Sequence, residues 1–160
     1  MNRPTPIAAA AGLTRRRALL LPLLTPLTPA FAAPPTRVDV WLSPSCGCCH
    51  DWIAELQAKG FAVTAHDDGN TAARARLGMP MRHGSCHTAL VDGYALEGHV
   101  PVREIRRLLN ERPRAVGLAV PGMPVGSPGM DGPAYGGRRD PHDVLLVARD
   151  GSATVYQSYR

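Results

Sequence analysis

Three of the chain's four cysteines stand almost together, and this density limits the structures that the chain can adopt. Cys46, Cys48 and Cys49 share the motif Cys-Gly-Cys-Cys-His, and Cys86 follows much later in the motif Ser-Cys-His. Thiolates packed this closely repel one another unless they are oxidised to disulfides or share a soft cation. The motif therefore predicts either disulfide chemistry or metal chemistry. If all four cysteines are oxidised, three pairings are open.

The N-terminus has the three parts of an export signal. Arg15–Arg17 are basic, residues 18–24 are mostly apolar, and Ala30-Phe-Ala32 is a small-x-small cleavage pattern. We therefore predict a signal peptide over residues 1–32, and a mature domain over residues 33–160. The arginines partly match a twin-arginine signal, so both the twin-arginine and the general secretory routes are open. The apolar run is too short to span a bilayer, and no membrane span is expected in the mature chain.

Removal of residues 1–32 changes the charge of the chain. The full sequence has a formal charge of +5, with 18 Lys and Arg residues against 13 Asp and Glu residues. Four of those basic residues and none of the acidic ones precede residue 33, so the mature part has 14 against 13, a charge of +1. This balance gives no indication of a nucleic-acid partner. The exported compartment permits disulfides.

The mature part has the pattern of an α/β domain. Alternating β-formers predict strands, amphipathic runs predict helices, and Asp-Gly pairs predict hairpin turns. The expected strands are 37–42, 61–66, 86–91 and 94–97, the helices are 49–59, 70–77 and 102–110, and the C-terminal hairpin comprises 143–149 and 152–159. The expected order is βαβαββα, followed by a Gly/Pro-rich loop over 117–141 and the C-terminal β-hairpin. Asn70 is the expected cap of the second helix.

The predicted order and the place of the cysteine motif resemble the thioredoxin fold. In that resemblance, the segment from Val38 to Cys49 corresponds to the first strand and the Cys-Gly-Pro-Cys turn of thioredoxins. Cys46 and Cys49 fall on the two redox positions, and Cys48 replaces the proline. Cys86 falls near the loop that faces the active site, so the resemblance implies that all four sulfur atoms converge at one edge of the domain. A helix N-terminus also favours thiolates.

A wider set of motifs resembles a more specific family. The motifs are Cys46-Gly-Cys-Cys-His50, Ser85-Cys-His-Thr88, Glu97-Gly-His-Val-Pro101 and the Gly/Pro-rich run from Val120 to Met130. Together they resemble the CopG-type family of exported metal-binding proteins, which is associated with bacterial copper resistance. The resemblance implies a thioredoxin-like fold and periplasmic copper handling, with copper ions and other periplasmic copper-handling proteins as partners. It leaves the reaction open.

Copper(I) suits this residue set, because it is a soft ion that prefers thiolate and thioether ligands. We expect Cys46, Cys48, Cys49 and Cys86 to bind it, either as one ion or as a polynuclear copper–thiolate cluster. Zinc is the weaker alternative, because a Cys₄ zinc site usually has two separated Cys-x-x-Cys pairs.

Four other side chains are candidate auxiliary ligands or positioning groups. They are His50, His87, His99 and Met123. A histidine beside the cysteines can ligate a metal or simply face solvent. A methionine in a Gly/Pro-rich loop can ligate copper or anchor the loop by packing, and we favour packing for Met123 and Met130.

The sequence thus predicts an exported copper(I)-binding protein that sequesters copper, transfers it or changes its oxidation state. One alternative is a periplasmic thiol–disulfide oxidoreductase with Cys46 as nucleophile and Cys49 as resolving thiol. A second alternative is a structural module stapled by disulfides. Enzymatic activity as a copper/thiol oxidoreductase stays open, because a thiol pair can reduce copper(II) while it closes a disulfide.

The export signal generates the first prediction. The mature protein should begin near Ala33, because cleavage is expected directly after Ala30-Phe-Ala32. N-terminal sequencing of the exported protein measures this. A chain recovered with Arg15–Arg17 still attached would contradict it.

Overall fold

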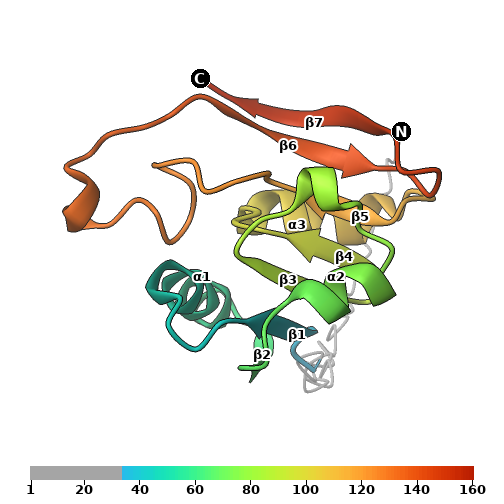
Figure 1. Cartoon of the computed structure of the whole chain (residues 1–160), viewed down its shortest axis with the longest axis horizontal. Coiled ribbons are helices and arrows are strands. Elements are labelled where there is room, and N and C mark those ends of the chain that lie inside the picture. The colour runs from blue at the N-terminus through green and yellow to red at the C-terminus, as the bar shows by residue number, and fades with distance from the viewer. Residues whose placement is uncertain (1–33) are drawn as a thin grey trace, which may run out of the picture. The chain divides into compact units, whose positions relative to one another are not determined.

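In the computed structural model, which describes residues 34–160, seven strands form one mixed sheet with three α-helices packed around it (Figure 1). The predicted signal peptide lies outside the described residues. The strands are β1 (Arg37–Leu42), β2 (Ala62–His66), β3 (His87–Val91), β4 (Tyr94–Glu97), β5 (Gly117–Ala119), β6 (His142–Val147) and β7 (Ala153–Tyr159). The helices are α1 (Gly47–Ala58), α2 (Thr71–Arg76) and α3 (Val102–Glu111). Met81–His83 and Pro133–Tyr135 form short 3-10 turns.

The strand order in the sheet is β2-β1-β3-β4-β5-β6-β7. Strand β1 pairs in parallel with β2 and antiparallel with β3, and β4 pairs antiparallel with β3 and in parallel with β5. The remaining pairs, β5 with β6 and β6 with β7, are antiparallel. The predicted α/β class, the element order through α3 and the C-terminal hairpin are therefore confirmed.

The main core lies between the sheet and helices α1 and α3. Val38, Val40 and Leu42 alternate along β1 with more exposed residues, so they all reach the same buried face. They join the buried face of α1, including Trp52, and that of α3, including Ile105, in one apolar cluster. Full burial of side chains of this size stabilises the fold by about 1.5–3 kcal/mol each. Trp52 also donates an indole hydrogen bond to the Val100 carbonyl at 2.9 Å.

A smaller apolar cluster contains Met79, Ala95, Ala119 and Val147, with Leu77 and Val116 against it. Successive residues of β4 divide between the two clusters, since Leu96 belongs to the main one and Ala95 to the smaller one. All four residues of β4 are buried. The sheet is therefore covered on both sides at β4, the strand that ends beside the cysteine region.

The start of α1 was predicted too late. The helix begins at Gly47, so Cys48 and Cys49 lie in its first turn and Cys46 is the residue before it. Glycine has a low helix propensity, which argues against a helix start there. The first turn nevertheless tolerates it, because its N–H groups have no intrahelical partner to lose.

The predicted loop over 117–141 also needs correction, because Gly117–Ala119 form strand β5 between β4 and β6. Glycine at position 117 makes this pairing feasible. A Cβ atom there would lie 1.7 Å from the Ala95 carbonyl oxygen, at a φ of +156°.

Asn70 was predicted to cap α2, but its side chain donates instead to the Ser85 carbonyl at 3.1 Å.

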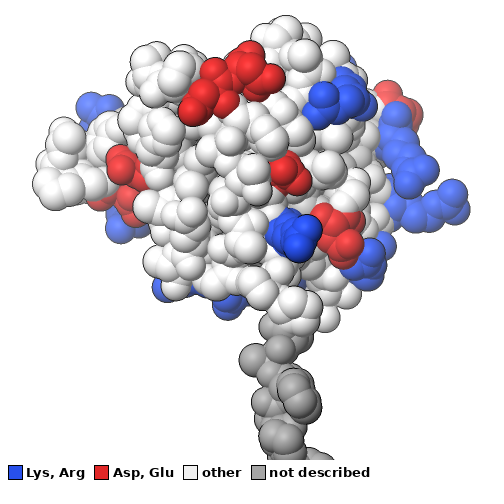
Figure 2. All heavy atoms as spheres, turned by 90° about the horizontal axis from the view of Figure 1, so that it is seen from below, with Lys and Arg blue, Asp and Glu red and all other residues white. Residues whose placement is uncertain are grey.

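The surface carries charges of both signs. On the face in Figure 2, basic and acidic side chains are interspersed and separated by uncharged surface. This distribution agrees with the near-neutral balance of residues 33–160. Within the described part of the chain, no helix combines the length and the apolar character needed to cross a membrane.

A buried ion pair joins α2 to the end of β4. The Arg74 guanidinium donates to Glu97 Oε1 from Nε at 2.9 Å and from Nη2 at 2.7 Å, and the two side chains are 6% and 0% exposed. The same carboxylate accepts from the Ser85 backbone N–H and from the Thr88 hydroxyl, each at 2.6 Å. Arg74 Nη2 also donates to the Ser85 carbonyl at 2.6 Å. The pair therefore holds the backbone of the residue directly before Cys86.

The ion pair generates the second prediction. Arg74→Met should lower the free energy of unfolding by about 3–5 kcal/mol, because it leaves a buried carboxylate without its cation. Urea denaturation at neutral pH measures this. The control is Arg138→Met, which removes an exposed contact to Asp140 at 3.7 Å and should leave stability nearly unchanged. Equal losses in both variants would contradict the assigned role of the pair.

Candidate metal centre

The cysteine motif lies at the N-terminus of α1. Cys46 precedes the helix, and its carbonyl accepts from the backbone N–H groups of Cys49 at 3.2 Å and His50 at 3.3 Å. Cys46 and Cys49 form a disulfide, whereas Cys48 and Cys86 are free thiols. The unpaired N–H groups and the dipole of a helix N-terminus stabilise negative charge on sulfur. This end of α1 therefore suits cysteines that must become thiolates.

The fold brings the fourth cysteine to the same place. Cys86 lies directly before β3, and the Sγ atoms of Cys46, Cys48, Cys49 and Cys86 all lie within 4.8 Å of one another. Cys49 is buried, and the other three are partly exposed. The Cys46 and Cys48 sulfur atoms are 3.6 Å apart. The arrangement offers a group of soft ligands to one ion, or to several ions with bridging sulfur atoms, once the disulfide is reduced.

Two buried histidines flank Cys86. His99 Nε2 lies 3.0 Å from the Cys86 sulfur, and His87 Nδ1 lies 3.5 Å from it. His99 Nδ1 donates to the Pro128 carbonyl at 2.6 Å, so in the neutral ring Nε2 is the acceptor that faces the thiol. Cys86, His87 and His99 form a second group whose ligand atoms lie within 4.8 Å of one another. The sulfur cluster thus borders imidazole nitrogen on one side.

Burial controls the protonation of these groups. It raises the pKa of the Cys86 thiol to about 11, and the neighbouring Cys48 adds to the rise. Burial lowers the pKa of His87 to about 3, with a further contribution from His99, and it also lowers the pKa of His99. At neutral pH Cys86 is therefore a neutral thiol beside two neutral imidazoles. A bound cation would instead favour the deprotonated form of Cys86, because it stabilises the thiolate.

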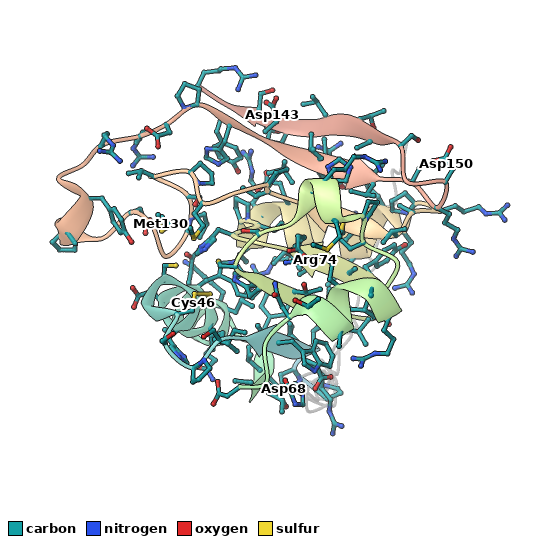
Figure 3. All side chains as sticks on the ribbon, in the orientation of Figure 1. Cys46, Asp68, Arg74, Met130, Asp143 and Asp150 are labelled. Atoms are coloured by element: carbon teal, nitrogen blue, oxygen red, sulfur yellow. A yellow bond between two sulfur atoms is a disulfide. The ribbon has the colours of Figure 1, made fainter. Side chains whose placement is uncertain are left out.

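The loop after β5 lies over the N-terminus of α1. Gly129 has a φ of +77°, and a Cβ atom there would meet the Cys48 carbonyl oxygen at 2.5 Å and the Trp52 backbone nitrogen at 2.8 Å. Its neighbour Pro128 supplies the carbonyl that orients His99. Figure 3 shows Met130 on this loop, beside the end of α1 that carries Cys46. The loop therefore belongs to the wall of the site.

The predicted auxiliary residues fall into two groups. His87 and His99 lie against Cys86, as described above. His50 is exposed, with Nε2 3.4 Å from the Pro44 carbonyl, and the Met123 residue is 55% exposed. Met130, by contrast, is partly buried and accepts a hydrogen bond from the Tyr135 hydroxyl at 3.2 Å. The geometry thus separates the histidines near Cys86 from the two more peripheral candidates.

Sequence reasoning missed the groups that position the site. Arg74 and Glu97 were not expected to meet, although a charged residue in the apolar strand Tyr-Ala-Leu-Glu is a signal that a buried partner is needed. The role of the Pro128 carbonyl had no signal, because every residue type carries a backbone carbonyl.

The fold and the site define a mixed α/β protein with a cluster of four cysteines at a helix N-terminus. A family model described as a protein of unknown function, DUF411, matches residues 83–130. Two solved structures, forms 2 and 1 of a copper resistance protein copG, are each 48% identical to the chain. Their TM-scores are 0.73 and 0.72, over 79% and 78% of this chain and 99% and 98% of theirs. No curated protein matches. The chain belongs to the family of these copper resistance proteins.

The contact of Gly129 with α1 generates the third prediction. Gly129→Ala should lower the free energy of unfolding by about 1–3 kcal/mol, because the new Cβ meets backbone atoms at a φ that L-residues rarely adopt. It should also make the Cys86 thiol react faster with a maleimide, because the loop over the site is displaced. Chemical denaturation and labelling kinetics measure the two effects.

Gly132→Ala in the same loop is the matched control. Position 132 has a φ of −69°, and a Cβ atom there meets nothing within 4 Å. This variant should behave like the wild type in both measurements. Equal behaviour of the two variants would show that the close contact does not position the loop.

Proposed function

We propose that this chain is an exported protein that binds copper(I) through Cys46, Cys48, Cys49 and Cys86 and serves copper resistance. The observation that carries the proposal is the convergence of four sulfur atoms from two distant segments to within 4.8 Å of one another. The solved relatives, which are 48% identical and are named copper resistance proteins, support the same function. Export rests on the three-part N-terminus, and periplasmic copper-handling proteins are the expected partners.

Copper(I) fits this group better than harder ions do. It prefers thiolate ligands, and the sulfur atoms are close enough for one thiolate to bridge two ions. The positive charge of the ions would offset the repulsion among the thiolates. His99 and His87 add nitrogen donors at the edge of the group, at 3.0 and 3.5 Å from the Cys86 sulfur. Zinc remains the weaker alternative.

Binding by all four thiolates requires the Cys46–Cys49 disulfide to be reduced first, which takes two electrons and two protons. The reverse reaction gives the site a redox function. When the two thiols close the disulfide, they release two electrons and two protons, and two copper(II) ions become copper(I). The same site can therefore bind copper and change its oxidation state.

A thiol–disulfide oxidoreductase is the second candidate function. Its support is the disulfide itself, in which Cys46 is partly exposed and Cys49 is buried. An exposed sulfur suits the nucleophile, and a buried one suits the resolving thiol.

We also propose that β1 to α3 is a thioredoxin-like unit. The support is the strand order β2-β1-β3-β4, with β2 parallel to β1 and β3 antiparallel to it.

Cys86→Ser separates these functions and is the fourth prediction. Copper(I) affinity of the reduced protein should fall more than about tenfold, which is about 1.4 kcal/mol, because a hydroxyl is a poor ligand for a soft ion. Anaerobic competition with a copper(I) chelator measures the affinity. Val155→Ala is the control, since it truncates a residue on β7 that is 58% exposed and outside the cysteine group.

The two candidate functions give opposite results for the cysteine variants. An oxidoreductase that does not use Cys86 would keep its disulfide-reduction activity in Cys86→Ser and lose it in Cys46→Ser. Copper(I) affinity that is unchanged in Cys86→Ser would eliminate the four-thiolate site.

A further inference from the structure

The two free thiols lie next to each other beside the closed disulfide. Cys48 and Cys86 are the cysteines that remain once Cys46 and Cys49 have paired, and their sulfur atoms lie within 4.8 Å of each other. A disulfide needs a sulfur separation of about 2 Å, so closure requires only a local movement. One partner lies in the first turn of α1, and the other directly precedes β3.

We propose that Cys48 and Cys86 form a second redox pair, so that the site cycles between two disulfides and four thiols. This inference rests on the proposed copper function and adds a four-electron capacity to it. The Cys46–Cys49 pair alone supplies two electrons. With the second pair, a reduced chain converts four copper(II) ions to copper(I).

The chemistry of the second pair is the same as that of the first. The Cys48 and Cys86 thiols lose two protons and two electrons as the S–S bond forms, and two copper(II) ions accept the electrons. Glutathione disulfide can replace copper as the oxidant. Its S–S bond then breaks, and the two electrons and two protons appear as two glutathione thiols. Both reactions balance with an oxidant of a named class.

The surroundings favour pairing within one chain over pairing between chains. Ser85, the neighbour of Cys86, is held by the buried Arg74–Glu97 pair. Gly129 covers the Cys48 carbonyl, and neither Cys48 nor Cys86 is fully exposed. The two thiols are thus held close to each other inside the fold, which gives the intramolecular reaction a high effective concentration.

Full oxidation would also end copper binding by the cysteines. A disulfide sulfur is a far weaker ligand than a thiolate, so closure of both pairs leaves no thiolate in the group. The site would then release copper(I) when it has given up its four electrons. The second pair therefore couples the redox state of the site to its occupancy.

Tryptic digestion provides a direct test on the metal-free protein. Residues 38–59 form one peptide with Cys46, Cys48 and Cys49, and residues 83–103 form another with Cys86. After oxidation with glutathione disulfide, mass spectrometry without reduction should find these two peptides linked. The linked pair should be lighter by four hydrogen atoms than the sum of the reduced peptides. In Cys48→Ser the link should be absent.

A second variant isolates the proposed pair. In Cys46→Ser/Cys49→Ser the remaining thiols can form only the Cys48–Cys86 bond, and the linked peptides should be lighter by two hydrogen atoms. The inference is overturned if these thiols stay reduced, or if they form linked dimers of the chain. The peptide map of the wild type keeps the test valid if this variant does not fold.

Electron counting with copper(II) completes the experiment. Reduced protein is mixed anaerobically with excess copper(II) and a copper(I) chelator. The wild type should yield about four copper(I) ions per chain. The double variants Cys46→Ser/Cys49→Ser and Cys48→Ser/Cys86→Ser should each yield about two. A wild-type yield of two would overturn the inference but leave copper binding intact. The opposite result is also distinguishable: the protein forms both disulfides with glutathione disulfide, but in its reduced state it does not bind copper(I). That result would overturn the proposed function and leave the second redox pair intact.

Discussion

The buried pair of Arg74 and Glu97 is the interaction on which the geometry of the site depends. It joins α2 to the end of β4 and, through two short hydrogen bonds, fixes the backbone of Ser85. Hydrophobic packing is nondirectional and cannot by itself place one sulfur atom relative to three others. Charge-assisted hydrogen bonds have the required direction, and in this dry environment their loss is costly. Cys86 therefore meets the α1 cysteines because a carboxylate and a guanidinium hold its neighbour.

The cysteine group combines contributions with different physical roles. The N-terminus of α1 supplies three sulfur atoms and a dipole that favours negative charge. The segment before β3 supplies the fourth sulfur in a buried setting that favours the neutral thiol. The loop with Pro128 and Gly129 orients His99 and covers the first turn of the helix. A cation is the one addition that would stabilise all four thiolates at once.

The sequence predicted the parts of the fold that follow from local patterns. Alternation predicted β1 and the Asp92-Gly93 turn predicted β4, both with their observed bounds, and helical periodicity predicted α3 to within one residue. The predictions failed at two glycines, of which Gly47 was placed before the helix and Gly117 in a loop. Gly47 opens α1, and Gly117 allows β5 to approach β4 closely. Position 117 needs the small size of glycine, whereas a Cβ atom at position 47 would meet nothing within 4 Å. Composition does not distinguish these two cases.

The site was predictable as chemistry and only partly as geometry. The four cysteines and the two buried histidines could be named, because their ligand chemistry is visible in the residue types. Arg74 and Glu97 are 23 positions apart, and no periodic pattern joins them. The Pro128 carbonyl belongs to the backbone, so its contact with His99 could not be predicted from the residue type. Met123 is the opposite case. Its thioether made it a candidate ligand from the sequence, but the residue is exposed in the structure.

The close contact of Gly129 with α1 also closes one side of the first turn of the helix, which carries Cys48 and Cys49. Backbone already lies against the Cys48 carbonyl and the Trp52 nitrogen, too close to leave room for even one added methyl group. A folded protein that approached the helix from this side would have to displace the loop first. The loop thus closes this side of the first turn of α1 to any partner that does not displace it.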